Sequence, residues 1–211
     1  MLLCYAMADF LKIAILGAPG VGKTAIIQQF VWNQFAEESC NPHGGVYRPS
    51  VVLNDRIYHL VILDIPASLV FTNNQQEWIE RWSESGDHGI QPAHAYILVY
   101  DICCFSSFEY IKAVHQLIVA KRPPGSGKAP ILIVGNKRDL QRRRVAPRRN
   151  VAALVKRSWK CGYIECSAKY NWHILLLFKE LLKTVGCLAC KSAHASACLQ
   201  GGLRANRCVI L

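Results

Sequence analysis

The stretch that decides the fold reads Gly17-Ala18-Pro19-Gly20-Val21-Gly22-Lys23-Thr24. It matches the pattern G-x-x-x-x-G-K-[ST] and lies between an apolar run, which predicts a strand, and a segment of helical period. Glycines in this pattern let backbone N–H groups turn inward around phosphate oxygens, and the helix N-terminus adds a favourable dipole. The pattern predicts a phosphate-binding loop in which Lys23 reaches the β- and γ-phosphates, the Thr24 hydroxyl binds Mg²⁺, and Ala25 also contacts the ligand.

A second stretch, Asn136-Lys137-Arg138-Asp139, directly follows an apolar run, at the sheet edge where open α/β sheets bind ligands. A carboxylate at Asp139 can accept hydrogen bonds from guanine N1–H and the 2-amino group, whereas adenine offers neither donor. We expect Asn136 to brace this loop and the Lys137 side chain to lie against the purine ring. Taken alone, the four residues are also compatible with a solvated turn.

The third stretch, Glu165-Cys166-Ser167-Ala168-Lys169, ends the next apolar run. The Ala168 backbone N–H is expected to meet guanine O6, and Ser167 and Lys169 beside it are expected to contact the nucleotide. Because the three stretches follow one another in this order, we interpret them together as one guanine-nucleotide site.

Apolar, β-branched runs alternate with segments of helical period along the chain. The runs predict six strands, at Leu11–Leu16, Val46–Leu53, Ile57–Leu63, Tyr96–Tyr100, Ile131–Val134 and Tyr163–Cys166. The periodic segments predict helices at Gly22–Phe35, Gln75–Ser85, Ser106–Lys121, Arg148–Trp159 and Trp172–Val185. Asn54-Asp55 predicts a hairpin turn, so one strand pair should be antiparallel. The expected fold class is α/β, with a six-stranded, mostly parallel sheet and helices on both faces.

Composition limits the remaining possibilities. We expect an N-terminal extension at residues 1–10, one nucleotide-binding domain at 11–185 and a flexible tail at 186–211. No apolar run approaches the ~20 residues that cross a bilayer, so no spanning segment is expected. The ten cysteines are interpreted as reduced thiols rather than as a disulfide scaffold. The net charge of +11 favours an anionic partner. The phosphates of one nucleotide account for little of this charge, so a membrane surface or a nucleic acid is the more suitable partner.

These stretches, together with Ile62-Leu63-Asp64, resemble the Ras superfamily over residues 11–185. Leu98–Cys103 and Tyr163–Leu177 are similar to the Ras-like family 10 branch in particular. The resemblance implies the P-loop NTPase fold of Ras-like proteins, GTP or GDP with Mg²⁺ as ligands, and GTPase activity. It also implies that Phe35 packs against the guanine and that Asp64 holds Mg²⁺ through water.

The sequence departs from the family in switch I, where family members usually present a threonine to Mg²⁺ and the γ-phosphate. Here the segment reads Asn41-Pro42-His43-Gly44-Gly45, with His43 at or near the threonine position. An imidazole can donate a hydrogen bond to phosphate, but it is a poor ligand for Mg²⁺. His43 is therefore either a group that senses the nucleotide or a solvated loop histidine.

Switch II departs more clearly, because the usual D-x-x-G-Q reads Asp64-Ile65-Pro66-Ala67-Ser68. Ala67 replaces the hinge glycine. Ser68 replaces the glutamine that orients the attacking water, and its side chain is too short for that task. Pro19, where Ras-type loops commonly carry glycine, removes one N–H from the phosphate loop. Lys23, Thr24 and Asp64 remain to support catalysis, so we expect GTP hydrolysis with low intrinsic activity.

The chain ends in Cys208-Val209-Ile210-Leu211, a C-a-a-X box whose terminal leucine favours geranylgeranylation of Cys208. One lipid anchors a protein weakly, so a second membrane signal is expected. Candidates are the positive charges of Lys191, Arg204 and Arg207 and palmitoylation of Cys187, Cys190 or Cys198. An alternative reads Cys187, Cys190, His194 and Cys198 as zinc ligands, although their spacing is shorter than in zinc fingers.

Two segments leave alternatives open. Phe71–Gln91 is longer than the usual switch II, and it places Trp78 and Trp82 on one helical face that belongs either to the core or to a partner surface. The basic run Arg142–Arg149 is a solvated face or helix start, an anionic-membrane contact, or a nuclear targeting patch. No aromatic platform accompanies the run, so we expect no specific nucleic-acid binding.

The sequence thus predicts a monomeric small GTP-binding protein that acts as a signalling switch, with effectors and regulators of unknown identity. Its expected address is the cytoplasmic face of a membrane, the plasma membrane first, with a nuclear or nucleolar pool. One alternative is a constitutively GTP-bound, non-catalytic adaptor at a membrane or in the nucleus. Another is a scaffold that uses only its basic surface.

Overall fold

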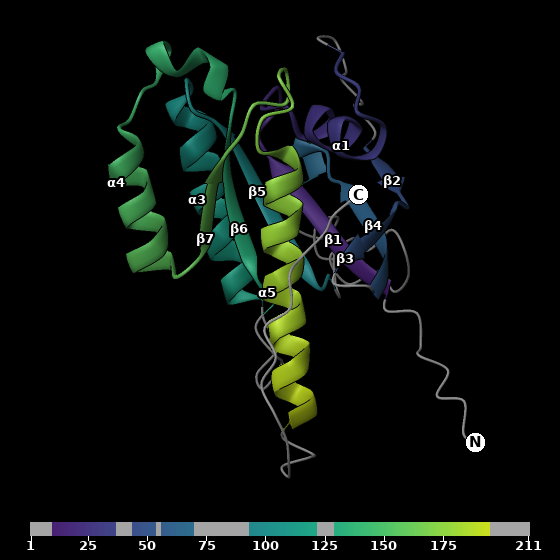
Figure 1. Ribbon diagram of the computed structural model, residues 1–211. Helices are drawn as coiled ribbons and strands as arrows, with labels where there is room; N and C mark the ends of the chain where they lie inside the picture. The colour runs from purple at the N-terminus through teal and green to yellow at the C-terminus, as the bar shows by residue number, and fades with distance from the viewer. Residues whose placement is uncertain (1–9, 37–43, 54–55, 70–92, 122–128, 195–211) are drawn as a thin grey trace, which may run out of the picture.

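The computed structural model describes residues 10–36, 44–53, 56–69, 93–121 and 129–194. A seven-stranded sheet has the order β2-β4-β1-β5-β6-β7, with β3 also paired to β4 (Figure 1). The strands are β1 Phe10–Gly17, β2 Gly45–Tyr47, β3 Ser50–Leu53, β4 Arg56–Asp64, β5 Ala95–Asp101, β6 Ile131–Asn136 and β7 Gly162–Glu165. The helices are α1 Lys23–Trp32, α3 Phe105–Ala120, α4 Arg148–Ala153 and α5 Ile174–His194, with 3₁₀ helices η1 Ala67–Leu69 and η2 Arg138–Arg143.

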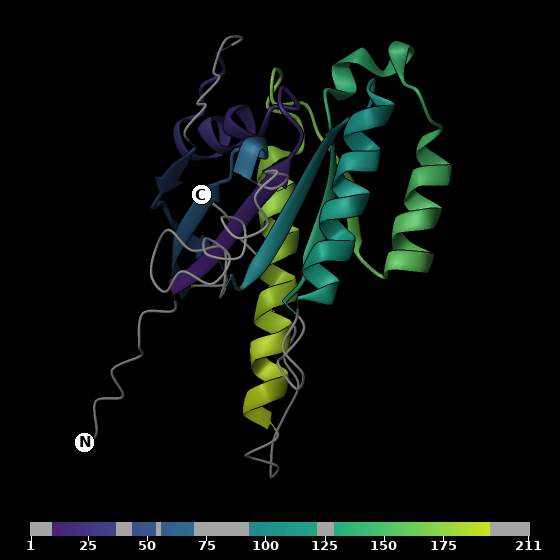
Figure 2. The same ribbon diagram turned by 180° about the vertical axis from the view of Figure 1, so that it is seen from behind.

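The sheet is covered on both faces because its central strands are apolar on both sides. Along β1, Ile13 and Ile15 belong to one buried cluster and Ala14 and Leu16 to the other. The first cluster contains the buried faces of α1 and α5, and the second contains those of α3 and α4. Figure 1 shows α5 in front of the sheet, and Figure 2, from behind, shows α3 in front. The predicted α/β class with helices on both faces is confirmed.

The predicted count of six strands is wrong, because the expected strand Val46–Leu53 is two strands, β2 and β3. Both pair antiparallel with β4 and keep one register, from Gly45 opposite Asp64 to Ser50 opposite His59. Pro49 lies between them and has no N–H to donate to the ladder, although its carbonyl accepts from the Leu60 N–H at 2.9 Å. The antiparallel pair expected from the Asn54-Asp55 turn is confirmed, whereas the turn itself lies outside the described residues.

The helix predictions differ mainly at the boundaries. The segment predicted at Arg148–Trp159 is helical throughout, but its second half, Leu154–Trp159 (η3), is π-helical. The last helix begins at Ile174 rather than Trp172 and continues to His194, past the predicted end at Val185. Gly186 does not end it, because a single glycine costs a helix only about 1 kcal/mol.

Several predictions lie outside the described residues: the helix Gln75–Ser85 with Trp78 and Trp82, the loop histidine His43, and the lipid site Cys208. The described part of the chain contains no helix that is long and apolar enough to cross a membrane.

Candidate functional site

One cavity of about 590 Å³ lies among the loops that follow β1, β4, β6 and β7. The phosphate loop contributes Pro19, Gly20, Gly22, Lys23, Thr24 and Ala25 to its wall, and the base loop contributes Asn136, Lys137 and Asp139. Phe35, Asp64, Ser68, Ala168 and Lys169 complete the set of predicted site residues that line it. The structure therefore brings three separate stretches of sequence to one cavity, as their order along a parallel sheet requires.

The phosphate loop turns into α1 through Gly22, whose φ of +92° is accessible mainly to glycine. A Cβ on Gly22 would approach the Asn136 side-chain nitrogen to 2.4 Å, so this position also requires glycine for space. Gly20, with a φ of +72°, has no atom within 4 Å of an added Cβ and lies open to the cavity. The loop backbone can therefore come close to a ligand in the cavity.

Lys23 and Thr24 lie at the start of α1 and face the cavity. The Lys23 ammonium donates to the carbonyl oxygens of Gly17 at 2.9 Å and Ala18 at 3.1 Å, which holds it at the mouth of the loop. The Thr24 hydroxyl donates to the Asp64 carboxylate at 2.5 Å, although 40 residues separate the two. Phosphate oxygens at this loop would meet the ammonium, the helix N-terminus and the hydroxyl together.

Asp64 is a buried carboxylate that is only 4% exposed at the end of β4. Burial raises its pKa above the ordinary value, and the Thr24 hydrogen bond and the Lys23 charge oppose this shift without cancelling it. A carboxylate and a hydroxyl are oxygen ligands of the kind that Mg²⁺ prefers, and a divalent cation would favour the ionised form. The donor set of Thr24 and Asp64 therefore fits the predicted magnesium site.

Asn136 connects the phosphate loop to both base-reading loops. It is buried at the end of β6, and its side-chain N–H donates to the Val21 carbonyl at 2.9 Å. Its side-chain oxygen accepts from the Ala168 N–H at 3.1 Å and from the Cys166 thiol at 3.5 Å. Asn136 therefore joins these loops, as a bracing residue would. The Ala168 N–H, expected at guanine O6, donates to Asn136 in this structure, so its contact with the base stays a prediction.

Asp139, the residue expected to select guanine, follows β6 and lies exposed at the cavity wall. The Ser167 hydroxyl donates to its carboxylate at 2.6 Å and thereby fixes its orientation. Lys137 adopts the left-handed conformation, with a φ of +62°, and its ammonium lies 2.8 Å from the Asp101 carboxylate. Lys137 also lines the cavity, and the contact of its side chain with a purine ring stays a prediction.

Arg138 and Trp172 hold the base loop against the loop that follows β7, and the sequence reasoning assigned neither of them this role. The guanidinium carbon of Arg138 lies 4.0 Å from the centre of the Trp172 ring, and the Arg138 N–H donates to the Cys166 carbonyl at 3.1 Å. Trp172 in turn exchanges two backbone hydrogen bonds with Ser167. An arginine between Lys137 and Asp139 and a tryptophan soon after Ser167 are the signals that could have suggested this cation–π pair.

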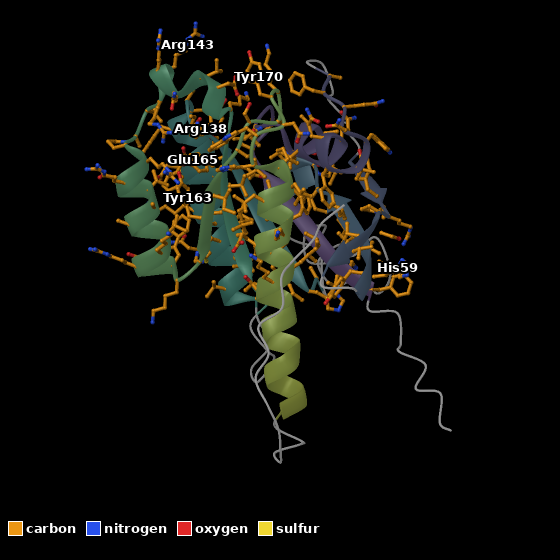
Figure 3. The ribbon with its side chains drawn as sticks, in the orientation of Figure 1. His59, Arg138, Arg143, Tyr163, Glu165 and Tyr170 are labelled. Carbon is orange, nitrogen blue, oxygen red and sulfur yellow. The ribbon has the colours of Figure 1, made fainter. Side chains whose placement is uncertain are left out.

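Glu165 ends β7, and only 1% of its side chain is exposed. A carboxylate buried to this degree is costly unless a cation pairs with it. Arg144 supplies it through two hydrogen bonds of 2.7 and 2.8 Å, and the Tyr163 hydroxyl adds a third at 2.7 Å. Figure 3 shows Tyr163, Glu165 and Arg138 next to one another, and the Arg138 nitrogen lies 3.8 Å from the carboxylate. Burial alone would raise the pKa of Glu165, but Arg144 and Tyr163 outweigh it and the pKa lies below its ordinary value.

The basic run is therefore not a uniformly solvated face, because Arg144 within it is an internal counter-ion. The signal in the sequence was a glutamate at the end of a buried strand, with several arginines close behind the base loop. Which of these arginines reaches Glu165 depends on how η2 places them, and this could not be read from the sequence.

The switch side of the cavity is made by Phe35, Pro66, Ala67 and Ser68. Ser68 is exposed and lines the cavity in η1, immediately after Ala67. The Tyr110 hydroxyl of α3 donates to the Ala67 carbonyl at 3.1 Å and ties η1 to the domain. Gly44 enters β2 with a φ of +70°, and a Cβ there would lie 2.2 Å from the Asp64 carbonyl oxygen. His43, directly before it, lies outside the described residues.

Comparisons with known proteins agree with this geometry. The family model that matches the chain is that of the Ras family, over residues 12–187. Ras-like protein family member 10B of Homo sapiens is 54% identical over 207 residues, which cover 97% of this chain and 100% of that protein. Human Ras-like protein family member 10A is 47% identical over 206 residues, 97% of this chain and 100% of that protein. The GTP-binding protein Rheb of Mus musculus is 34% identical over 172 residues, 81% of this chain and 85% of Rheb.

Proposed function

The chain belongs to the Ras family, and we propose that it works as a monomeric guanine-nucleotide switch that hydrolyses GTP slowly. One observation carries the proposal: the phosphate loop, the buried Asp64 and the base loop with Asp139 line a single cavity. A ligand that satisfies all three carries phosphates at one end and a purine with donors on its Watson–Crick edge at the other. A guanine nucleotide has both features.

Each group has a defined task in this proposal. Lys23 places its charge on the β- and γ-phosphates, where negative charge develops during phosphoryl transfer. Thr24 and Asp64 would hold Mg²⁺, which neutralises phosphate charge. Asp139 accepts from guanine and rejects adenine, because an adenine nucleotide would leave the carboxylate without its two donors.

Slow hydrolysis is proposed because the group that orients water has changed. Ser68 lies at the cavity wall where family members carry glutamine, and its hydroxyl stands on a single methylene. Ala67 replaces the glycine hinge, and its carbonyl is tied to α3 through Tyr110. A segment fixed in this way has less freedom to move a residue toward the γ-phosphate.

A second candidate function follows from the same observation. If the altered switch II does not support turnover at all, the protein is a constitutively GTP-bound adaptor whose partners recognise one state. The adaptor and the slow switch share the cavity and differ in the fate of the γ-phosphate.

The test is nucleotide analysis of purified protein that has been truncated before Cys208, followed by single-turnover hydrolysis of bound GTP. We expect bound guanine nucleotide and slow conversion of GTP to GDP. Retention of GTP without conversion over many hours would favour the adaptor. Hydrolysis at the rate of an ordinary Ras protein, or equal affinity for ATP, would contradict the proposal. The Lys23→Asn variant is the matched control, and it should retain little nucleotide.

We also propose that the protein is anchored to a membrane through a prenyl group on Cys208, with the plasma membrane as the main address and a nuclear pool beside it. The C-a-a-X box supports this, and Lys191, Arg204 and Arg207 supply charge for a second signal. The test compares wild type with Cys208→Ser in cells fed a geranylgeranyl analogue. The variant should lose both the label and the membrane fraction. If Lys23→Asn keeps its address and all partners, the protein is a scaffold rather than a switch.

A further inference from the structure

A second, smaller cavity lies outside the nucleotide site, between the start of α3 and α4. It has a volume of about 170 Å³, and Phe105, Phe108, Val145, Val151 and Leu154 form most of its wall. The polar side chains in the wall are Asn150 and Tyr100, and the Tyr100 hydroxyl is already hydrogen-bonded to that of Tyr163. Figure 2 shows α3 and α4 side by side on the face opposite α5. We call this cavity with its rim the α3–α4 groove.

The rim of the α3–α4 groove exposes large apolar side chains. Phe105 is 59% exposed, Val145 49% and Leu154 38%, and all three line the same cavity. Scattered apolar residues are normal on a protein surface, but a contiguous group around a concave site marks an interaction surface. An apolar cavity of about 150 Å³ is large enough to hold a benzene molecule. The groove therefore has room for one bulky side chain.

The elements that form the α4 wall are strongly basic. Arg142, Arg143, Arg149, Lys156 and Arg157 are all exposed, and none of them has an ion-pair partner within the described ranges. Arg148, also exposed, lies 3.8 Å from Glu165, whose carboxylate is already bound by Arg144. Neither the nucleotide cavity nor the internal ion pair uses this positive charge. It lies on the same short segments as the groove residues, since Arg149 precedes Asn150 and Arg143 lies two residues before Val145.

We propose that the α3–α4 groove docks a short acidic segment of a partner protein, with one large apolar side chain in the cavity and Asp or Glu residues on either side of it. The apolar side chain supplies the buried contact, as interface anchors do, and the flanking acids pair with the exposed arginines of η2 and α4. The residues that line the α3–α4 groove all come from positions 100–154, and none of them lines the nucleotide cavity.

Other occupants fit the groove less well. A membrane surface presents lipid headgroups rather than one bulky apolar group that matches a cavity of this size. In Figure 1, η2 lies at the opposite end of the domain from the last turns of α5. A second copy of the chain would bring two basic surfaces together, at a net charge of +11 each. An acidic segment with one large apolar side chain fits both the volume of the cavity and the positive charge of η2 and α4.

The test uses a fluorescent nine-residue peptide with a central phenylalanine and four acidic residues on each side, titrated onto GDP-loaded full-length protein and followed by anisotropy and amide NMR shifts. We expect shifts at Phe105, Val145 and Leu154. Replacing the central phenylalanine with alanine should weaken binding at least tenfold. Phe105→Ser and Arg149→Glu should each weaken it about fivefold or more. Val119→Ser and Lys121→Glu, at the other end of α3, are the matched controls and should leave it unchanged.

Several results would overturn the proposal. Equal binding of the phenylalanine and alanine peptides would mean that only charge is recognised. Binding to vesicles of phosphatidylcholine and phosphatidylserine that Phe105→Ser abolishes, without peptide binding, would identify a membrane surface. A dimer in sedimentation that the same variant dissociates would identify a second copy.

Discussion

Two buried carboxylates lie at the ends of strands near the nucleotide cavity and are held in different ways: Asp64 lines the cavity, whereas Glu165 lies outside its wall, behind the loops that read the base. At the base end, Glu165 is held by Arg144 and Tyr163, and its pKa lies below the ordinary value. At the metal end, Asp64 is held by the Thr24 hydroxyl, and burial keeps its pKa above the ordinary value. Arg144 is the cation that pairs with Glu165, and it belongs to the chain itself. Asp64, beside the Thr24 hydroxyl, is instead suited to bind an external cation such as Mg²⁺.

The base end and the metal end also differ in how closely their motifs follow the Ras pattern. At the base end, three contacts join the base loop to the loop that follows β7: Asn136 to Ala168, Asp139 to Ser167 and Arg138 to Trp172. The metal end borders Ala67 and Ser68, the positions that differ most from a typical Ras sequence. We infer that the base end selects the nucleotide and that Ala67 and Ser68, beside the metal end, set the rate of its hydrolysis, whereas binding itself also needs Lys23. The predictions below test this division, in order of decreasing effect.

The largest effect is expected when Asp139→Asn removes the carboxylate that reads guanine. Affinity for GDP should fall roughly 10⁴-fold, because a site built to pair with the donors of a base loses most of its discrimination without its acceptor. Xanthosine diphosphate should gain affinity, since its ring offers an acceptor where guanine has an amino group. Competition against a fluorescent GDP analogue measures both changes. Unchanged GDP affinity would mean that the base end does not read the base.

The next effect concerns stability. Arg144→Gln should lower the free energy of unfolding by about 3 kcal/mol, because it leaves the buried Glu165 charge without its bidentate partner. Urea unfolding of GDP-saturated protein measures the loss. Arg149→Gln is the matched control, because Arg149 is exposed and has no ion pair among the described residues, and its cost should stay within about 0.5 kcal/mol. Equal costs for the two variants would contradict the role given to Arg144.

Turnover should respond at the other end of the cavity. Ser68→Gln restores a side chain long enough to orient water, and we expect single-turnover hydrolysis of GTP to rise about tenfold, or ~1.4 kcal/mol in the barrier. Ser68→Asn is one methylene shorter and should gain little. GDP affinity should be the same in both variants. A rate that does not rise would show that Ala67, rather than Ser68, limits switch II.

A smaller effect is expected from the cation–π pair. Trp172→Leu should speed GDP release about fivefold, because a stacked arginine contributes about 1 kcal/mol and its loss loosens the loop that carries Asp139. Tyr170→Leu is the control, because Tyr170 is 68% exposed two residues away. Stopped-flow release of a fluorescent GDP analogue gives both rates. If the Trp172 variant releases GDP no faster, the pair is structural rather than a positioning device.

The smallest expected effect is the change with pH in what Glu165 contributes to stability. A carboxylate whose folded pKa lies below its ordinary value of 4.5 contributes stability above that pH, and the contribution is lost as the pH falls through the folded pKa. The stability gap between wild type and Glu165→Gln should therefore be constant from pH 7 to about 5 and narrow below about 4.5. Unfolding measured over this range tests it, and a gap that stays constant would show that the ion pair does not titrate.

Parts of the site could be predicted from the sequence where all the residues that form a loop lie within one short segment. Lys23 and Thr24 in the phosphate loop and Asp139 in the base loop are of this kind, and the resemblance to the Ras superfamily that they carry is confirmed. Pro49 was a signal in the sequence that the expected strand Val46–Leu53 is two strands. The apolar residues around it favoured the interpretation as one strand.

Residues whose roles depend on distant partners could not be predicted in this way. Arg144 is one arginine among several, and only the path of η2 selects it for Glu165. Trp172 continues a pattern of helical period, yet it forms a bridge with Ser167, because tertiary hydrogen bonds outweigh a weak helix preference at the end of a segment.

Asn136 has a further consequence, since a single amide group joins the loop for phosphate to both loops for the base. Through this link the two halves of the ligand bind as in a chelate: once one half is seated, the loops for the other half are already in place. Guanosine alone and pyrophosphate alone should each bind weakly. The binding free energy of each should be well below half of that of the whole nucleotide. A protein that pulls on the phosphate loop would also loosen the guanine pocket, and it could eject the whole nucleotide without touching the ring.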